Sequence, residues 1–174
     1  MTDCAPVTIL NGMKTAFETA VAAGTFSVPF DCRAGIVFDE KLPDLPGAGT
    51  SVLRPLVDLV LPVTPAMQLT GRYWYTHEVA VTVGLRQVLS GAYYRDDGTI
   101  DLDKIAPQLN LFYELIDFVF PSSTNLEGMP IAALGAKFQP PPDIVFMFHP
   151  ELLQTTKQYC GVFRATFKLA EAGQ

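Results

Sequence analysis

Apolar residues recur along the chain at two spacings, which predict where helices and strands lie. In residues 6–24 they fall three and four positions apart, which is the spacing of one stripe along a helix. Residues 103–120 show the same spacing, with Asp103 as a candidate N-cap and Pro107 in the first turn, where a proline removes no backbone hydrogen bond. We therefore expect two main α-helices.

Strict alternation of apolar and polar residues predicts strands at 33–40, 53–63, 71–89 and 158–170. The third opens with GRYWYTHEVAVTV, and its alternation divides it into two faces. One face carries Tyr73, Tyr75, His77, Val79, Val81, Val83 and Leu85, and the other carries Trp74, Thr76, Glu78, Thr82 and Arg86. This pattern is typical of a long, half-buried strand.

The remaining segments predict shorter elements and loops. Short strands are expected near 136–139 and 144–149, and one helical turn is expected at 149–156. Residues 41–51 are too rich in proline and glycine for a regular element, and residues 90–101 hold turn residues around Asp97 and Gly98.

This order of elements does not repeat as βαβ units. It predicts an α+β fold, with a mostly antiparallel β-sheet, two main α-helices packed on one face, and long loops. A length of 174 residues and a hydrophobic content of 49% suit one domain covering residues 1–174.

Charge and cysteine content exclude several classes of protein. A net charge of -6 argues against a general nucleic-acid binder, because that role needs clustered Lys and Arg. Cys4, Cys32 and Cys160 show no CxxC spacing, so we expect reduced thiols and no zinc site. The richest apolar run, at 56–63, is too short to span a bilayer, which predicts a soluble protein made in a cytoplasm.

No pattern of catalytic residues emerges. His77 lies on the apolar face of a predicted strand and His149 precedes a proline, so both are expected to be structural. No glycine-rich turn or helix start activates Cys160, and Asp96 and Asp97 before a glycine read as a surface turn, not a calcium loop. We expect neither an enzyme nor a cofactor or metal site.

The aromatic run at 73–75 leaves two interpretations open. Because neighbours on a strand point to opposite faces, Trp74 points away from Tyr73 and Tyr75. An exposed Trp74 would suit a protein interface, whereas loops of the same chain covering it would make it part of the core. The opposite wall of Tyr73, Tyr75 and His77 would suit a small-molecule binding module.

The order of motifs resembles a known family over roughly residues 7–170. A helix leads into AGTFSVPF, a strand with Arg33, the loop DEKLPDLPG and a valine-rich strand ending in a proline; GRYWYTHEVAVTVGLRQV, an apolar helix, HPELLQ and QYCGVFRATFKLA follow. The chain resembles the tail terminator, or tail completion, proteins of long-tailed bacteriophages. Its segments 90–107 and 125–143 are longer than in the simplest members.

The resemblance implies a structural virion protein of the tail and neck. Such a subunit forms a ring, expected to be hexameric, that caps the tail tube, stops its polymerisation and presents a surface to the head-completion or neck protein. DNA would pass through the lumen without specific binding. Alternatives are another neck, connector or tail-tube ring protein, or the small-molecule binding module.

Exposure and charge suggest which residues serve that role. The expected oligomer interface consists of Arg72, Trp74, Glu78, Arg86, Tyr94 and Arg95. The expected acidic lumen loops carry Asp39, Glu40, Asp44, Asp96 and Asp97.

Overall fold

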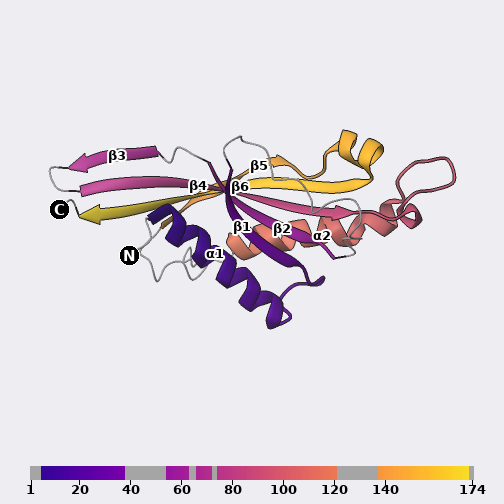
Figure 1. Cartoon of the computed structure of the whole chain (residues 1–174), viewed down its shortest axis with the longest axis horizontal. Helices are drawn as coiled ribbons and strands as arrows, with labels where there is room; N and C mark the ends of the chain where they lie inside the picture. The colour runs from indigo at the N-terminus through magenta and orange to yellow at the C-terminus, as the bar shows by residue number, and fades with distance from the viewer. Residues whose placement is uncertain (1–4, 38–53, 63–65, 72–73, 121–136, 173–174) are drawn as a thin grey trace.

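The computed structural model describes residues 5–37, 54–62, 66–71, 74–120 and 137–172. In chain order the elements are α1 (Ala5–Ala22), β1 (Asp31–Val37), β2 (Leu56–Pro62), β3 (Ala66–Gly71), β4 (Trp74–Val88), the short 3-10 turn η1 (Gly91–Tyr93), α2 (Leu102–Val119), β5 (Lys137–Phe146), the single helical turn η3 (Leu152–Thr156) and β6 (Gln158–Ala172). Figure 1 shows their arrangement.

The described strands form a six-stranded sheet. The order is β1-β2-β4-β6-β5, and β3 pairs with the first part of β4. The pairing of β1 with β2 is parallel, whereas the other described pairings are antiparallel. The expected α+β fold with a mostly antiparallel sheet is therefore confirmed.

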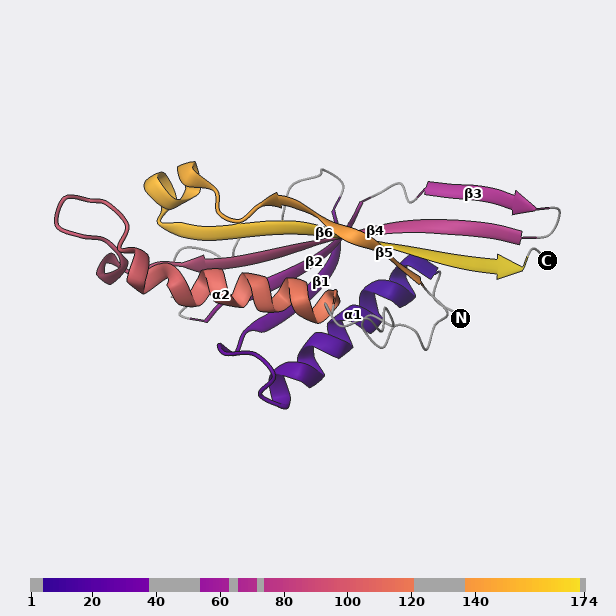
Figure 2. The ribbon, with the colours of Figure 1, turned by 180° about the vertical axis from the view of Figure 1, so that it is seen from behind.

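Both helices pack on one face of this sheet (Figures 1 and 2). The residues that meet them alternate along each strand, as Val57 and Leu59 do on β2, and Val81 and Val83 on β4. They are fully buried and belong to one cluster with residues of α1 and α2. The predicted one-sided packing of two helices is confirmed.

An aromatic cluster joins the two helices. Phe17 of α1 and Phe118 of α2 have ring centroids 5.4 Å apart. Phe26, from the AGTFSVPF segment, contacts Phe118 at 5.3 Å and Phe30 at 4.9 Å, both edge to face. The segment between α1 and β1 is therefore part of the core.

The start of α2 differs from the sequence prediction. Asp101, not Asp103, is the N-cap, and its carboxylate accepts the backbone N–H of Asp103 at 3.2 Å. Pro107 consequently lies beyond the first turn, where it does cost one backbone hydrogen bond. Its exposed position lets the ring point to solvent.

Two strands, β3 and β5, differ from the sequence prediction. The sequence pattern gave no strand at β3, which pairs with β4 over Ala66–Gly71. The two short strands expected near 136–149 are one strand, β5, that runs through three consecutive prolines. The pairing register with β6 breaks between Gln139 and Asp143, which places these prolines on an outer strand at an irregularity, where a missing N–H is tolerated.

The longest strands set the shape of the molecule. β4 and β6 pair along their full lengths, from Trp74 against Ala172 to Val88 against Gln158. Fifteen residues at about 3.3 Å each span roughly 45–50 Å. β3 lies beside β4 at one end, and the loop that follows β4 projects at the other end (Figures 1 and 2).

Candidate oligomer interface

The predicted interface residues lie towards both ends of β4. Trp74 and Glu78 belong to the end that pairs with β3, but only the backbone is described there. Arg72 lies outside the described residues. The exposure of Trp74 and the wall of Tyr73, Tyr75 and His77 are sequence predictions that fall outside the described side chains.

The opposite end of β4 continues into a projecting loop, Ser90–Asp101, which we call the tip loop. A bridge between Tyr94 and Ile100 closes it, and the N–H of Arg95 donates to the carbonyl oxygen of Thr99 at 2.8 Å. Gly98 has a φ of 80°, a conformation that glycine adopts without the steric penalty of a Cβ. The predicted turn at Asp97 and Gly98 is confirmed.

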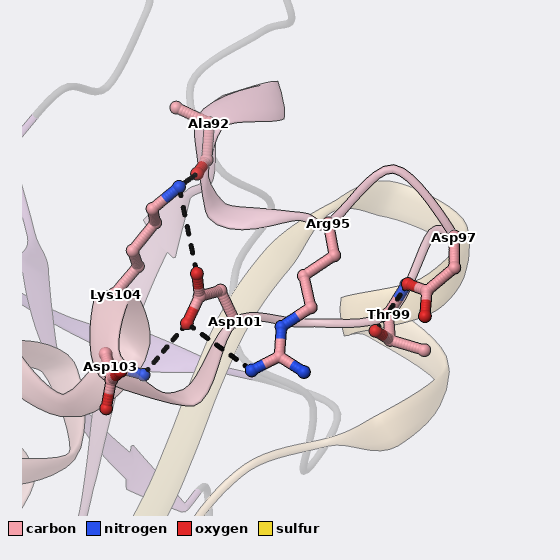
Figure 3. Close-up of polar contacts among 7 residues, drawn as sticks. All are labelled: Ala92, Arg95, Asp97, Thr99, Asp101, Asp103 and Lys104. Atoms are coloured by element: carbon pink, nitrogen blue, oxygen red, sulfur yellow. Dashed lines mark hydrogen bonds and ion pairs between the residues drawn. The ribbon is translucent and has the colours of Figure 1, made fainter.

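Hydrogen bonds fix the acidic tip of this loop (Figure 3). The carboxylate of Asp97 accepts the hydroxyl of Thr99 at 2.6 Å and its backbone N–H at 2.9 Å. These two bonds hold the pKa of Asp97 below its ordinary value. Asp96 beside it is exposed, so the tip presents negative charge to solvent.

The base of the tip loop is bound to the start of α2. Asp101 lies 3.9 Å from Arg95 and 3.8 Å from Lys104, measured between oxygen and nitrogen. Lys104 also donates to the carbonyl oxygen of Ala92 at 2.7 Å (Figure 3). The loop is therefore held in one orientation relative to the helix.

Tyr94 and Arg95, both expected at an interface, have different surroundings. The hydroxyl of Tyr94 donates to the carbonyl oxygen of Leu153 at 2.7 Å, and the ammonium of Lys157 lies 5.5 Å from the centre of its ring. Burial raises the pKa of Tyr94. The side chain of Arg95 is 59% exposed. Arg95 thus offers an accessible cation, whereas Tyr94 holds the tip loop against η3.

The prediction for Arg86 is wrong as an exposed interface position. Its side chain is only 7% exposed, although it lies on the sheet face opposite the helices. Its Nε donates to Asp58 at 2.9 Å, and its Nη2 donates to the same oxygen. The physical reason is that polar residues in the sequence do not guarantee that a sheet face is exposed to solvent. Leu56, Val60 and Val162, on the same face as Arg86, are buried too.

Asp58 is the centre of a charged row that sequence patterns did not single out. Its carboxylate is 1% exposed and accepts Arg33 on one oxygen, at 2.6 Å from Nε, and Arg86 on the other. The three residues come from the adjacent strands β1, β2 and β4. The only sequence signal for this row was the alternation of polar residues along each strand. That Arg33, Asp58 and Arg86 lie side by side could be known only from the register in which the three strands pair.

A second feature missed from sequence is a set of exposed apolar side chains in β5, just after β5 and on α2, here called the edge patch. It comprises Tyr113, Ile144, Val145 and Phe148, which are between 43% and 49% exposed. The hydroxyl of Tyr113, on α2, lies 2.9 Å from the sulfur of Met147, which connects the helix to the segment after β5. Exposed apolar groups of this kind are often protein contact sites.

The thiols and His149 are in structural surroundings. Burial raises the pKa of Cys160 to about 11 and that of Cys32 to about 12, so both are protonated at neutral pH and are poor nucleophiles. His149 makes an edge-to-face contact with Phe146 and lies 3.5 Å from the backbone nitrogen of Leu152. These contacts agree with the structural role expected of His149.

Other predicted features are only partly accessible. Asp39, Glu40 and Asp44 lie outside the described residues. Within the described ranges no group of His, Cys, Asp and Glu is arranged to hold a metal ion. None of the helices in that part of the chain has the length and apolar character needed to cross a membrane.

Comparison with known proteins gives no family: no protein-family model matches the chain, and no curated protein matches it.

Proposed function

We propose that this chain is the subunit of a tail terminator ring in a long-tailed bacteriophage. In this role, six copies cap the tail tube, stop its polymerisation and present a surface to a head-completion or neck protein. The ring is a virion component, and DNA passes through its lumen without specific binding. The order of sequence motifs that resembles this family supports the proposal.

The observation that carries the proposal furthest is the separation of two unlike ends of the molecule by one long strand. The tip loop lies at one end of β4 and the β3 pairing lies at the other. An elongated subunit with unlike ends suits a cap, which must contact a tube on one side and another protein on the other.

The charge of the tip loop supports a place near DNA. The hydrogen bonds from Thr99 lower the pKa of Asp97, which favours its charged form, and the neighbouring Asp96 is exposed at the same tip. A lumen lined with carboxylates repels phosphates, so DNA slides without being retained. We assign the tip loop to the lumen on this basis.

Negative-stain microscopy of the purified protein, alone and mixed with tail tubes of its own particle, tests the proposed function. We expect rings, or a cap at one end of each tube, and tubes that no longer elongate when tube subunits are added. Tube subunits without this protein are the control. Binding to the head connector but to neither tube end would instead assign the chain to the neck, and a monomer that binds neither would refute a ring role.

A further inference from the structure

The described sheet has two unlike outer edges. β1 is the outer strand on one side and β5 is the outer strand on the other. An outer strand offers a row of backbone N–H and C=O groups to another strand. Because the two edges belong to different strands, joining them between copies makes a head-to-tail contact, which closes into a ring when the rotation is suitable.

The β5 edge carries features that favour a partner strand. Ile144 and Val145 are 44% and 43% exposed, and Phe148 follows them at 44%. The three prolines have no N–H to donate, so they divide this edge into Lys137–Gln139 and Asp143–Phe146, and the second segment has a further irregularity between Ile144 and Phe146. The short apolar segment after the prolines is thus available to pair with another strand, whereas the prolines themselves cannot donate backbone hydrogen bonds.

We propose that neighbouring copies of this chain join through β5 of one copy and β1 of the next, so that their sheets become continuous. The inference rests on the proposed ring function and names the contact between its subunits. β1 and β2 are parallel, and each later step to β4, β6 and β5 is antiparallel. Two copies in the same orientation therefore bring β5 and β1 together antiparallel, which is the more stable pairing per residue.

The proposed junction keeps the register of the single copy without a shift between copies, and its contacts then follow. Ile144 lies at the level of Ala34, through Phe163, Val83 and Leu59. Asp143 lies at the level of Gly35, through Arg164, Thr82 and Val60. The exposed Ile144 then packs on Ala34 of the next copy, on the same face as the helices.

The opposite face of the junction is complementary in charge. In the row Arg86, Asp58, Arg33, the guanidinium of Arg33 lies on the outer strand β1, and 37% of its side chain is exposed. At the β5 edge Asp143 is 67% exposed and lies 3.6 Å from Arg164. Asp143 and Arg33 of the next copy are diagonal neighbours, roughly 7–8 Å apart and within reach of long side chains. The charges then alternate along the joined sheets.

The junction is small. The four side chains of the edge patch are about half exposed and have at most about 250 Å² of surface each, so they offer less than roughly 500 Å² of accessible apolar surface. A stable interface buries roughly 800 Å² per partner. A single junction is therefore weak, and a closed ring or a tube end is needed to hold copies together. This agrees with subunits that assemble on a template.

A cysteine crosslink between copies tests the junction directly. Gly35→Cys and Asp143→Cys would face each other at about 5.5 Å between Cα atoms, within disulfide range, and a Cβ at Gly35 meets no atom within 4 Å. Oxidation of a mixture of the two variants should give a dimer whose linked peptide joins positions 35 and 143, and the double variant should give a ladder of oligomers. Gly35→Cys mixed with Asp96→Cys, a change at another exposed aspartate, is the matched control.

The outcomes separate this junction from the proposed function. Linkage of either single variant to itself at the yield of the mixture, or no 35–143 linkage up to the solubility limit, would overturn the β5–β1 junction. Tube capping without this linkage would leave the terminator role standing and refute the junction. Linked oligomers that never bind a tube end would support the junction and refute the terminator role.

A charge exchange tests the register by a second route. Gly35→Glu places a carboxylate opposite Asp143, and Asp143→Lys places two cations near each other; each should weaken association about fivefold per junction. Mixing the two variants should restore it, because the new lysine then faces the new glutamate. Glu151→Lys makes the same change of charge as Asp143→Lys at an exposed position outside β1 and β5 and should have no effect; equal weakening by all three variants would contradict the register.

Discussion

At the scale of single residues, the most demanding interaction is the burial of Asp58 with two guanidiniums. A carboxylate that is 1% exposed must be paired, because an isolated buried charge costs far more than a surface one. Arg86 is buried as well and donates twice to one oxygen, while Arg33 serves the other. Removing one of the arginines should therefore lower the stability by more than the net contribution of the ion pair, because it leaves the buried carboxylate of Asp58 without a donor.

We expect Arg86→Ala to lower the free energy of unfolding by about 3 kcal/mol, since it leaves a buried oxygen of Asp58 without its donors. Urea denaturation followed by circular dichroism measures the change. Arg95→Ala is the matched control: its exposed pair with Asp101 at 3.9 Å should contribute less than about 1 kcal/mol. Equal losses in the two variants would mean that Arg86 is solvated and that the pairing is not structural.

Buried thiols give the stability a dependence on alkaline pH. The pKa of Cys160 is raised from 9.0 to about 11, so the folded state holds its proton more tightly than the unfolded state does. The sign follows: this contribution is complete below pH 9 and is lost as the pH rises towards 11. Between pH 8 and 10, Cys160 should account for a loss of about 1 kcal/mol.

Urea denaturation at pH 8 and 10, with wild type compared with Cys160→Ala, isolates this effect, because Cys32 is common to both proteins. The variant should lose about 1 kcal/mol less than the wild type over that interval. An identical loss would show that Cys160 does not titrate in this range.

At the scale of elements, close packing of β6 on α2 depends on a glycine. A Cβ at Gly161 would lie 2.8 Å from the carbonyl oxygen of Met147 and 2.8 Å from a ring carbon of Phe112. Phe112 is fully buried and packs edge to face on Phe163, so its ring has little room to move. The helix, the strand and the segment after β5 all meet at this point.

We expect Gly161→Ala to destabilise the protein by about 1–3 kcal/mol through overpacking. Gly35→Ala, where a Cβ meets nothing within 4 Å, should change stability by less than about 1 kcal/mol. Thermal or urea unfolding of the pair gives the comparison. A neutral Gly161→Ala would show that the Phe112 ring moves aside at little cost.

At the scale of the whole molecule, β4 and β6 hold two unlike ends far apart. The tip loop is fixed to α2 through Asp101 and Lys104 and to η3 through Tyr94, so its acidic tip has a defined direction. In the proposed ring, six such tips surround the path of the DNA. A change of charge there is repeated in every subunit.

We expect Asp96→Lys to make assembled rings retain duplex DNA at low salt and release it at high salt, because clustered cations displace counterions from phosphates. Gel mobility of labelled DNA with rings at two salt concentrations measures this. Glu18→Lys makes the same change of charge at a half-exposed position on α1 and should leave retention unchanged. Equal retention by both variants would place the tip loop outside the lumen.

Sequence by itself determined the elements whose pattern reflects local physics. Helical spacing gave α1 and α2, alternation gave β2, β4 and β6, and the Asp97–Gly98 turn followed from the conformational freedom of glycine. The α+β class and the packing of both helices on one face also followed, because apolar faces must be buried together. No strand was expected at β3, and β5 was divided in two, since its prolines are tolerated only because it is an outer strand.

Only the tertiary structure decided which polar residues meet and which face solvent. Arg86 and Asp58 are separated by 28 positions, and nothing local indicates that the register brings them together or that their face is buried. The exposed Ile144 and Val145 likewise depend on β5 having no described neighbour on its outer side. Pattern along a chain reports the two faces of a strand, whereas burial depends on what is packed against each face.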